Sequence, residues 1–171
     1  PLLALGDDAA EVGVAVTAAS KGWNIAGLKC AVIISQSAKM HEKLNELPPA
    51  LHYRASLLGA FATVAAFEKG EIWLDAVLEQ LDQNRRLIAE LINSKIPAIG
   101  YTIPHCSYLA WLDVSKLNLG EDPGAAILER AKVAFNPGHI YGSLGKDHVR
   151  LNFATSPEII SEAFDRMARA F

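Results

Sequence analysis

Only two cysteines, Cys30 and Cys106, occur among the 171 residues, and they stand far apart in apolar stretches. Two such cysteines do not make a disulfide framework, so we expect reduced core residues and a cytoplasmic location. Long apolar runs are lacking as well, because the longest, residues 57–67, is broken by Gly59 and Thr63 and is too short to cross a bilayer. We therefore predict no membrane partner and no signal peptide.

An excess of one charge is also lacking, since 16 basic residues stand against 19 acidic ones for a net charge of −3. No block of Lys or Arg stands out, so we predict no nucleic-acid partner. The five histidines show no metal-ligand spacing, and we expect no metal site. What remains is 51% hydrophobic and 20% charged, the composition of a folded globular protein.

The first third of the chain predicts buried strands. Residues 12–16 (VGVAV) and 31–34 (AVII) are apolar without alternation, which is typical of strands inside an α/β sheet. Residues 24–27 between them leave room for a single helical turn. Because the chain opens at Pro1 and passes almost directly into strand-like sequence, we interpret it as a piece of a longer polypeptide.

Helical periodicity begins at Ser37. The pattern predicts a helix over residues 37–47, stopped by Pro48 and Pro49, and a second over 56–69. The second is nearly all apolar, so we expect it to be buried on most sides, and Gly70 ends it. Residues 71–94 form the longest amphipathic pattern, a helix of about 36 Å.

The last third alternates between strands and helices. Strands are predicted over residues 107–114, 133–135 and 148–153, and helices over 122–132 and 156–171. Ser156 and Pro157 are an N-cap and a first helical residue in the final helix. The predicted fold class is therefore α/β, with a small α+β unit at the C-terminal end.

Lys21 is the residue that most clearly suggests chemistry. It directly follows a predicted buried strand and is itself followed by Gly22, Trp23 and Asn24. A partly desolvated lysine at the end of a strand can serve as a nucleophile toward a carbonyl group. From the spacing alone, however, a surface lysine in a turn is the commoner situation.

A family resemblance adds to this. Ser20-Lys21-x-x-Asn24 with Gly27-Leu28-Lys29 resembles the Schiff-base lysine motif of the class I/II aminotransferase family, which is fold type I and depends on pyridoxal phosphate. The string SKGWNIAGLKCA is most similar to the branch of cystathionine β-lyases and related C–S lyases. Further segments match that branch in order and approximate spacing: residues 57–66, 70–75, 107–113, 137–138, 141–142 and 149–152.

The resemblance implies a domain organisation and an activity. Residues 1–70 would be the end of the large cofactor-binding domain, and residues 71–171 the connecting helix and the small C-terminal domain. The full-length protein would be a homodimer that binds pyridoxal 5'-phosphate and acts on an amino acid. C–S β-elimination is the first expectation and transamination the alternative. A non-catalytic regulatory or interaction module is the third possibility.

The resemblance also implies roles for individual residues. Lys21 would hold the cofactor and remove the substrate α-proton, and Arg150 would bind the substrate α-carboxylate. Ser20 and Lys29 would contact the cofactor phosphate, while Trp23 and Tyr141 would line the substrate pocket.

Two positions depart from the family pattern. Ala18 stands where many relatives have a hydroxyl residue, and Lys29 stands where many have arginine. The remaining cofactor contacts of the family lie upstream of this sequence, so we expect residues 1–171 alone to be inactive.

Overall fold

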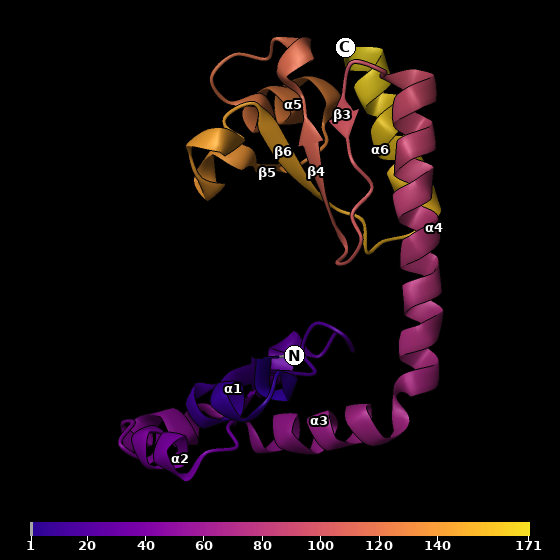
Figure 1. The fold of residues 1–171 in the computed structure, drawn as a ribbon. Helices are drawn as coiled ribbons and strands as arrows, with labels where there is room; N and C mark the ends of the chain where they lie inside the picture. The colour runs from indigo at the N-terminus through magenta and orange to yellow at the C-terminus, as the bar shows by residue number, and fades with distance from the viewer. Residues whose placement is uncertain (1) are drawn as a thin grey trace. The chain divides into compact units, whose positions relative to one another are not determined.

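The computed structural model describes residues 2–171 apart from the side chain of His52 (Figure 1). The chain divides into two compact units, the first ending at Ala76 and the second running from Val77 to Phe171. The division lies inside helix α4 (Glu71–Lys95), a few residues beyond the expected 70/71 boundary. Among the helices of the described residues, none combines the length and the apolar character needed to cross a membrane.

The first unit begins with short elements: η1 (Leu2–Ala4), α1 (Asp7–Val12), β1 (Ala15–Thr17), η2 (Ala26–Leu28) and β2 (Val32–Ile34). The helix α1 was missed by the sequence prediction, which began a strand at Val12. Asp7 and Asp8 lie in the first turn of α1, where carboxylates interact favourably with the positive end of the helix dipole. The strand that follows is therefore shorter and begins later than predicted.

Strands β1 and β2 form an antiparallel pair in which Val16 lies opposite Ile33. The prediction that they are buried was wrong for the described chain, because Val16 is 70% exposed and Ile33 49% exposed. An apolar run indicates a strand that can be buried, but burial requires a layer packed on each face. Within residues 2–171, the apolar side chains of this two-stranded sheet remain largely open to solvent.

Three helical segments complete the first unit: α2 (Ala38–Asn45), the 3₁₀ segment η3 (Pro49–Arg54) and α3 (Leu57–Lys69). The two α-helices were predicted, and each begins with a serine whose hydroxyl accepts a backbone N–H. Ser37 accepts from Met40 at 3.3 Å and Ser56 from Gly59 at 3.2 Å. Each cap satisfies a donor at the start of the helix that has no intrahelical partner.

The expectation that α3 is buried on most sides was wrong. Gly59, Thr63 and Ala66 are its buried residues, and they follow one narrow stripe. Gly59 lies so close to the backbone of Leu28 that an added Cβ would approach the Leu28 carbonyl oxygen to 2.3 Å. The other faces of α3 are mostly exposed in the described chain; their large apolar side chains are Leu57, Leu58, Phe61, Val64 and Phe67.

The second unit is built on a four-stranded antiparallel sheet with the order β3-β4-β6-β5. Its strands are β3 (Gly100–Tyr101), β4 (Leu109–Asp113), β5 (Asn136–Pro137) and β6 (His148–Asn152). The predicted strand at residues 133–135 was wrong, because the chain pairs with β6 one residue later, at Asn136. The remaining elements are η4 (Ser115–Leu117), α5 (Pro123–Ala131), η5 (Gly138–Tyr141), η6 (Ser143–Gly145) and α6 (Pro157–Ala170).

One face of this sheet forms the core of the unit. Ala110 and Leu112 of β4 and Val149 of β6 are fully buried, and they alternate with outward-facing neighbours. They pack with α5, α6 and the second half of α4; Figure 1 shows α6 alongside that part of α4. Buried members from the helices and loops include Ile88, Ile127, Phe153, Phe164 and Met167.

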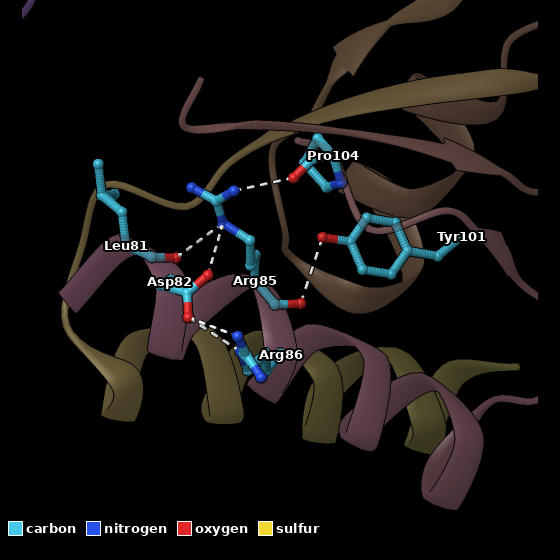
Figure 2. Close-up of polar contacts among 6 residues, drawn as sticks. All are labelled: Leu81, Asp82, Arg85, Arg86, Tyr101 and Pro104. Carbon is cyan, nitrogen blue, oxygen red and sulfur yellow. Dashed lines mark hydrogen bonds and ion pairs between the residues drawn. The ribbon is translucent and has the colours of Figure 1, made fainter. Parts of the chain in front are cut away.

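Hydrogen bonds connect α4 with β3 and the segment that follows it (Figure 2). Arg85 donates from Nη1 to the Pro104 carbonyl at 2.9 Å, and its Nε lies 3.7 Å from a carboxylate oxygen of Asp82. The Tyr101 hydroxyl donates to the Arg85 carbonyl at 3.3 Å. Burial raises the pKa of Tyr101 to about 12, and the nearby Arg85 charge opposes that rise. Arg85 is thus engaged both by a carboxylate and by a backbone carbonyl.

Candidate functional site

Lys21 lies in a tight turn four residues after the end of β1. The Trp23 N–H donates to the Ala19 carbonyl at 3.0 Å, and the Ile25 N–H donates to the Ser20 carbonyl at 3.0 Å. These two bonds hold the backbone on both sides of Lys21. The Lys21 side chain is exposed, so the partial desolvation that we expected is not present in residues 2–171. The structure therefore shows an accessible primary amine on a hydrogen-bonded turn.

Trp23 anchors this turn within the first unit. Its indole Nε1 donates to the Gly70 carbonyl at 2.9 Å, and its ring meets the edge of Phe67 at a centroid distance of 5.0 Å. Gly70 must lack a side chain here, because an added Cβ would lie 2.3 Å from the Trp23 Nε1 atom. The indole N–H is therefore already used in fixing the Lys21 turn to the end of α3.

Lys29 and Ser20, the expected phosphate contacts, belong to the same unit. Lys29 ends η2 with a left-handed backbone (φ 50°), and its carbonyl accepts from the Ser56 N–H at 3.1 Å. This bond places the Lys29 backbone at the first turn of α3. The Lys29 side chain is exposed and Ser20 is half-buried. Neither Lys21 nor Lys29 forms an ion pair within the described part of the chain.

Arg150 lies in the second unit, on the face of the sheet that is turned away from the core. The pairing register places Trp111 of β4 and Asn136 of β5 directly opposite it on either side. The three residues therefore form a row across β4, β6 and β5. Trp111 could have been found from the alternation of residues 109–113. The position of Asn136 depends on a two-residue strand that the sequence pattern did not show.

Two neighbours hold the Arg150 guanidinium. Its Nη2 donates to the Asn136 Oδ1 at 3.2 Å, and its carbon atom Cζ lies 4.7 Å from the centre of the Tyr141 ring. Trp111 meets the Tyr141 ring edge-on at 5.7 Å and stacks on His148 at 5.4 Å. The structure thus brings together Arg150 and Tyr141, both predicted as substrate contacts.

Two glycines explain how Tyr141 reaches this position. Gly138 and Gly145 pack backbone to backbone, since a Cβ added to Gly138 would lie 2.3 Å from the Gly145 carbonyl oxygen. The reverse substitution would place a Cβ 2.1 Å from the Gly138 carbonyl oxygen. This contact folds η5 against η6 just before β6, and Tyr141 is the last residue of η5.

Arg150 keeps hydrogen-bonding capacity for a ligand. Its Nε is buried and has no hydrogen-bond partner in the described residues, and no carboxylate there forms an ion pair with it. Arg85, Arg86 and Arg166, in contrast, each face a carboxylate at 2.8–3.7 Å. A buried N–H without a partner is destabilising by about 1–3 kcal/mol. A guanidinium without a carboxylate partner can bind a carboxylate ligand through two parallel hydrogen bonds.

Among the described side chains, the cysteines and histidines offer no second centre. Both cysteines are free, and Cys106 is exposed, so the expectation that it is a core residue was wrong. Cys106 lies in an irregular segment between β3 and β4, where no described element covers it. Across the described residues, no group of His, Cys, Asp or Glu is arranged to hold a metal ion.

Comparison with known proteins defines the class. The fold matches the corresponding part of fold-type I enzymes that depend on pyridoxal phosphate. A crystal structure from Corynebacterium diphtheriae, of a protein assigned as a PLP-dependent β-cystathionase, superimposes with a TM-score of 0.92 at 40% identity. The match covers 98% of this chain and 45% of that one.

Sequence comparison narrows the relationship. A Mycobacterium leprae protein assigned as a cystathionine β-lyase is 38% identical over 174 residues, covering 94% of this chain and 43% of its own length. The LL-diaminopimelate aminotransferase of Moorella thermoacetica is 26% identical and also covers 94% of this chain, but 40% of its own length. No protein-family model matches the sequence. The chain is thus a homologue of cystathionine β-lyases and, more distantly, of aminotransferases, and it spans less than half the length of these relatives.

Proposed function

We propose that the chain is part of a pyridoxal-phosphate-dependent enzyme that acts on amino acids as a C–S β-lyase on cystathionine-like substrates. The observation that carries this proposal is Arg150, a guanidinium fixed by Asn136 and Tyr141 and left without a carboxylate partner in the described residues. The choice of C–S elimination is supported by the names of the more similar relatives.

Arg150 would bind the α-carboxylate of the substrate. A guanidinium is permanently charged and planar, so it can hold a carboxylate through two parallel hydrogen bonds and fix the orientation of the bonds at the α-carbon. Tyr141 would cover one face of that fork, and its ring would form part of the pocket wall. A lysine at this position would supply the charge but not the paired geometry.

Lys21 would hold the cofactor through Nζ and later accept the α-proton of the substrate at the same atom. When bound, pyridoxal phosphate supplies the electron sink for the chemistry at the α-carbon. The residues in the first unit fit this group in part, because they offer an accessible amine at Lys21 together with a hydroxyl at Ser20 and an ammonium at Lys29. Trp23 would act by holding the Lys21 turn, since its N–H is bonded to Gly70.

The test uses the full-length protein with added pyridoxal phosphate. Release of pyruvate and ammonia from cystathionine, without transfer of the amino group to 2-oxoglutarate, would support the lyase. Amino transfer without release of pyruvate would support the aminotransferase instead, the activity for which the Moorella relative is named. A protein that binds no cofactor and turns over neither substrate would contradict both and support a regulatory module.

The remaining assignments follow from the same proposal. Residues 1–70 would belong to the cofactor-binding domain and residues 71–171 to the connecting helix and C-terminal domain of a cytoplasmic homodimer. Because residues 1–171 supply few cofactor contacts, we expect them alone to bind pyridoxal phosphate weakly. Borohydride reduction of that piece followed by peptide mapping should then label several lysines. Exclusive labelling of Lys21 at low cofactor concentration would contradict this expectation.

A further inference from the structure

Asn136 and Tyr141 contact Arg150 from different directions. Asn136 lies opposite Arg150 in the β5–β6 pairing, and its Oδ1 accepts from Nη2 at 3.2 Å. Tyr141 comes from η5 and places its ring 4.7 Å from Cζ. The hydrogen bond to Asn136 restricts rotation of the guanidinium, and the Tyr141 ring packed against it restricts tilting.

From this arrangement we propose that Asn136 and Tyr141 are positioning residues, which hold the Arg150 fork in one orientation before a carboxylate ligand arrives. The inference rests on the proposed carboxylate-binding role of Arg150. Arginine side chains have many rotamers, and an unrestrained one must lose that freedom when its ligand binds. Holding the fork in advance moves this entropic cost from binding to folding.

Trp111 makes the arrangement rigid. It lies opposite Arg150 on the other neighbouring strand and meets the edge of the Tyr141 ring at 5.7 Å. The His148 ring stacks on the same indole at a centroid distance of 5.4 Å. Tyr141 is therefore supported by a side chain of the sheet itself, in addition to the packed glycines before β6.

The inference depends on Asn136 being uncharged. An amide oxygen orients the guanidinium and leaves its charge available, whereas a carboxylate at the same place would neutralise it and occupy a second N–H. Asn136→Asp should therefore compete with the ligand. Asn136→Ala should remove the hydrogen bond that orients the Arg150 guanidinium without adding a competing charge.

The experiment measures binding of propionate to the full-length protein with pyridoxal phosphate bound. Propionate has a carboxylate but no amino group, so it cannot react as a substrate. Its dissociation constant is measured by NMR on the propionate signals, which serve equally for the parent, the Asn136 and Tyr141 variants and Arg150→Lys, in parallel with KM and kcat for cystathionine. Asn93→Asp on the exposed surface of α4 makes the same charge change away from the sheet and is the control.

We expect Asn136→Asp to weaken propionate binding about tenfold or more, and Asn136→Ala and Tyr141→Leu about threefold each. Tyr141→Phe keeps the ring and should recover most of the affinity that Leu loses. The same variants should raise KM more than they lower kcat, a split that a purely structural role would not produce. If Asn136→Asp does not fold, the Tyr141 pair decides.

Two results overturn the inference. If Asn136→Asp and Tyr141→Leu bind propionate like the parent while Arg150→Lys does not, Arg150 needs no positioning and its proposed role still stands. If Arg150→Lys also binds propionate like the parent, Arg150 is not the carboxylate-binding residue, and the positioning role of Asn136 and Tyr141 is wrong as well. If cystathionine is not turned over but propionate binding follows the expected order, the positioning role stands and the proposed reaction is wrong.

Discussion

The two units differ in where their apolar side chains lie. The second unit buries a continuous cluster that includes Ile88, Leu112, Phe153 and Phe164, each at most 1% exposed. In the first unit the buried apolar residues are Ala19 and Ala66, both small. Its large apolar side chains, such as Phe61 at 67% and Leu58 at 70%, remain largely exposed within the described chain.

Because of this difference in burial, the unit with most of the folding free energy is not the unit that carries the proposed cofactor lysine. Burial of large apolar side chains is the main source of folding free energy, so the second unit should carry most of the stability of residues 2–171. The proposed cofactor lysine lies in the first unit, on a turn held by few hydrogen bonds. The proposed carboxylate site lies on the sheet of the second unit, where the core fixes its backbone.

The largest effect should come from the first unit, despite its small core. In the full-length protein, Lys21→Ala should lower kcat/KM by roughly three orders of magnitude or more, because the cofactor attachment and the base are lost together. Steady-state kinetics at saturating cofactor measure this loss. Lys39→Ala, which removes an exposed lysine of α2, is the matched control. Normal turnover by Lys21→Ala would contradict the proposed role.

The next largest effect is on the free energy of unfolding, and it is tested by one Phe→Ala substitution in each unit. Phe153 is fully buried, and Phe153→Ala should lower the free energy of unfolding of the second unit by about 3–5 kcal/mol. Phe61→Ala on α3 should change stability by less than about 0.5 kcal/mol in residues 1–171, because the side chain is already in water. Hydrogen exchange of the β4 and β6 amides, compared with the α3 amides, measures each unit. Equal losses for the two variants would contradict the comparison.

The same difference explains what the sequence could predict. The Ser156 cap and the apolar periodicity of residues 71–94 are local signals, and the structure has the helices α6 and α4 at these places. Burial is not local, because it depends on what packs above a segment. The apolar runs at residues 12–16 and 57–67 therefore suggested buried elements, whereas the structure shows exposed ones.

The candidate site divides in a similar way. Lys21 and Arg150 were found through short motifs that resemble a family, and Tyr141 through its place beside Gly142. Asn136 was missed because its contact with Arg150 arises from the register of β5 on β6, which involves only two residues of β5. No sequence period is long enough there to indicate a strand.

A smaller effect is expected at the carboxylate site. Arg150→Lys should raise KM for the amino acid about 10–100-fold and leave cofactor affinity unchanged, since the charge remains but the fork is lost. Kinetics and cofactor titration on the full-length protein measure the two quantities separately. Arg86→Lys on the exposed face of α4 is the control. An unchanged KM would show that Arg150 serves the sheet alone.

The smallest expected effect is a fall in the stability of the second unit at high pH, where Tyr101 ionises. Burial raises the pKa of Tyr101 to about 12 in the folded second unit, from the ordinary value of 10.0. Between these values the unfolded chain releases the phenolic proton while the folded chain keeps it, so the stability of the second unit should fall as pH rises from 10.0 toward about 12. Below pH 10.0 Tyr101 is protonated in both the folded and the unfolded chain, and this loss of stability does not occur.

Tyr101→Phe removes the titrating group and should weaken this fall in stability with pH. It also removes the hydrogen bond to the Arg85 carbonyl, so its stability at neutral pH should be slightly lower than that of the parent. Urea unfolding of residues 1–171 across this pH range, read from the amides of the second unit, gives both quantities. Tyr53→Phe in η3, whose side chain is 86% exposed, controls for the other tyrosines. The decisive quantity is the difference in slope between parent and Tyr101→Phe. Equal slopes would mean that Tyr101 ionises as readily in the folded unit as in the unfolded chain.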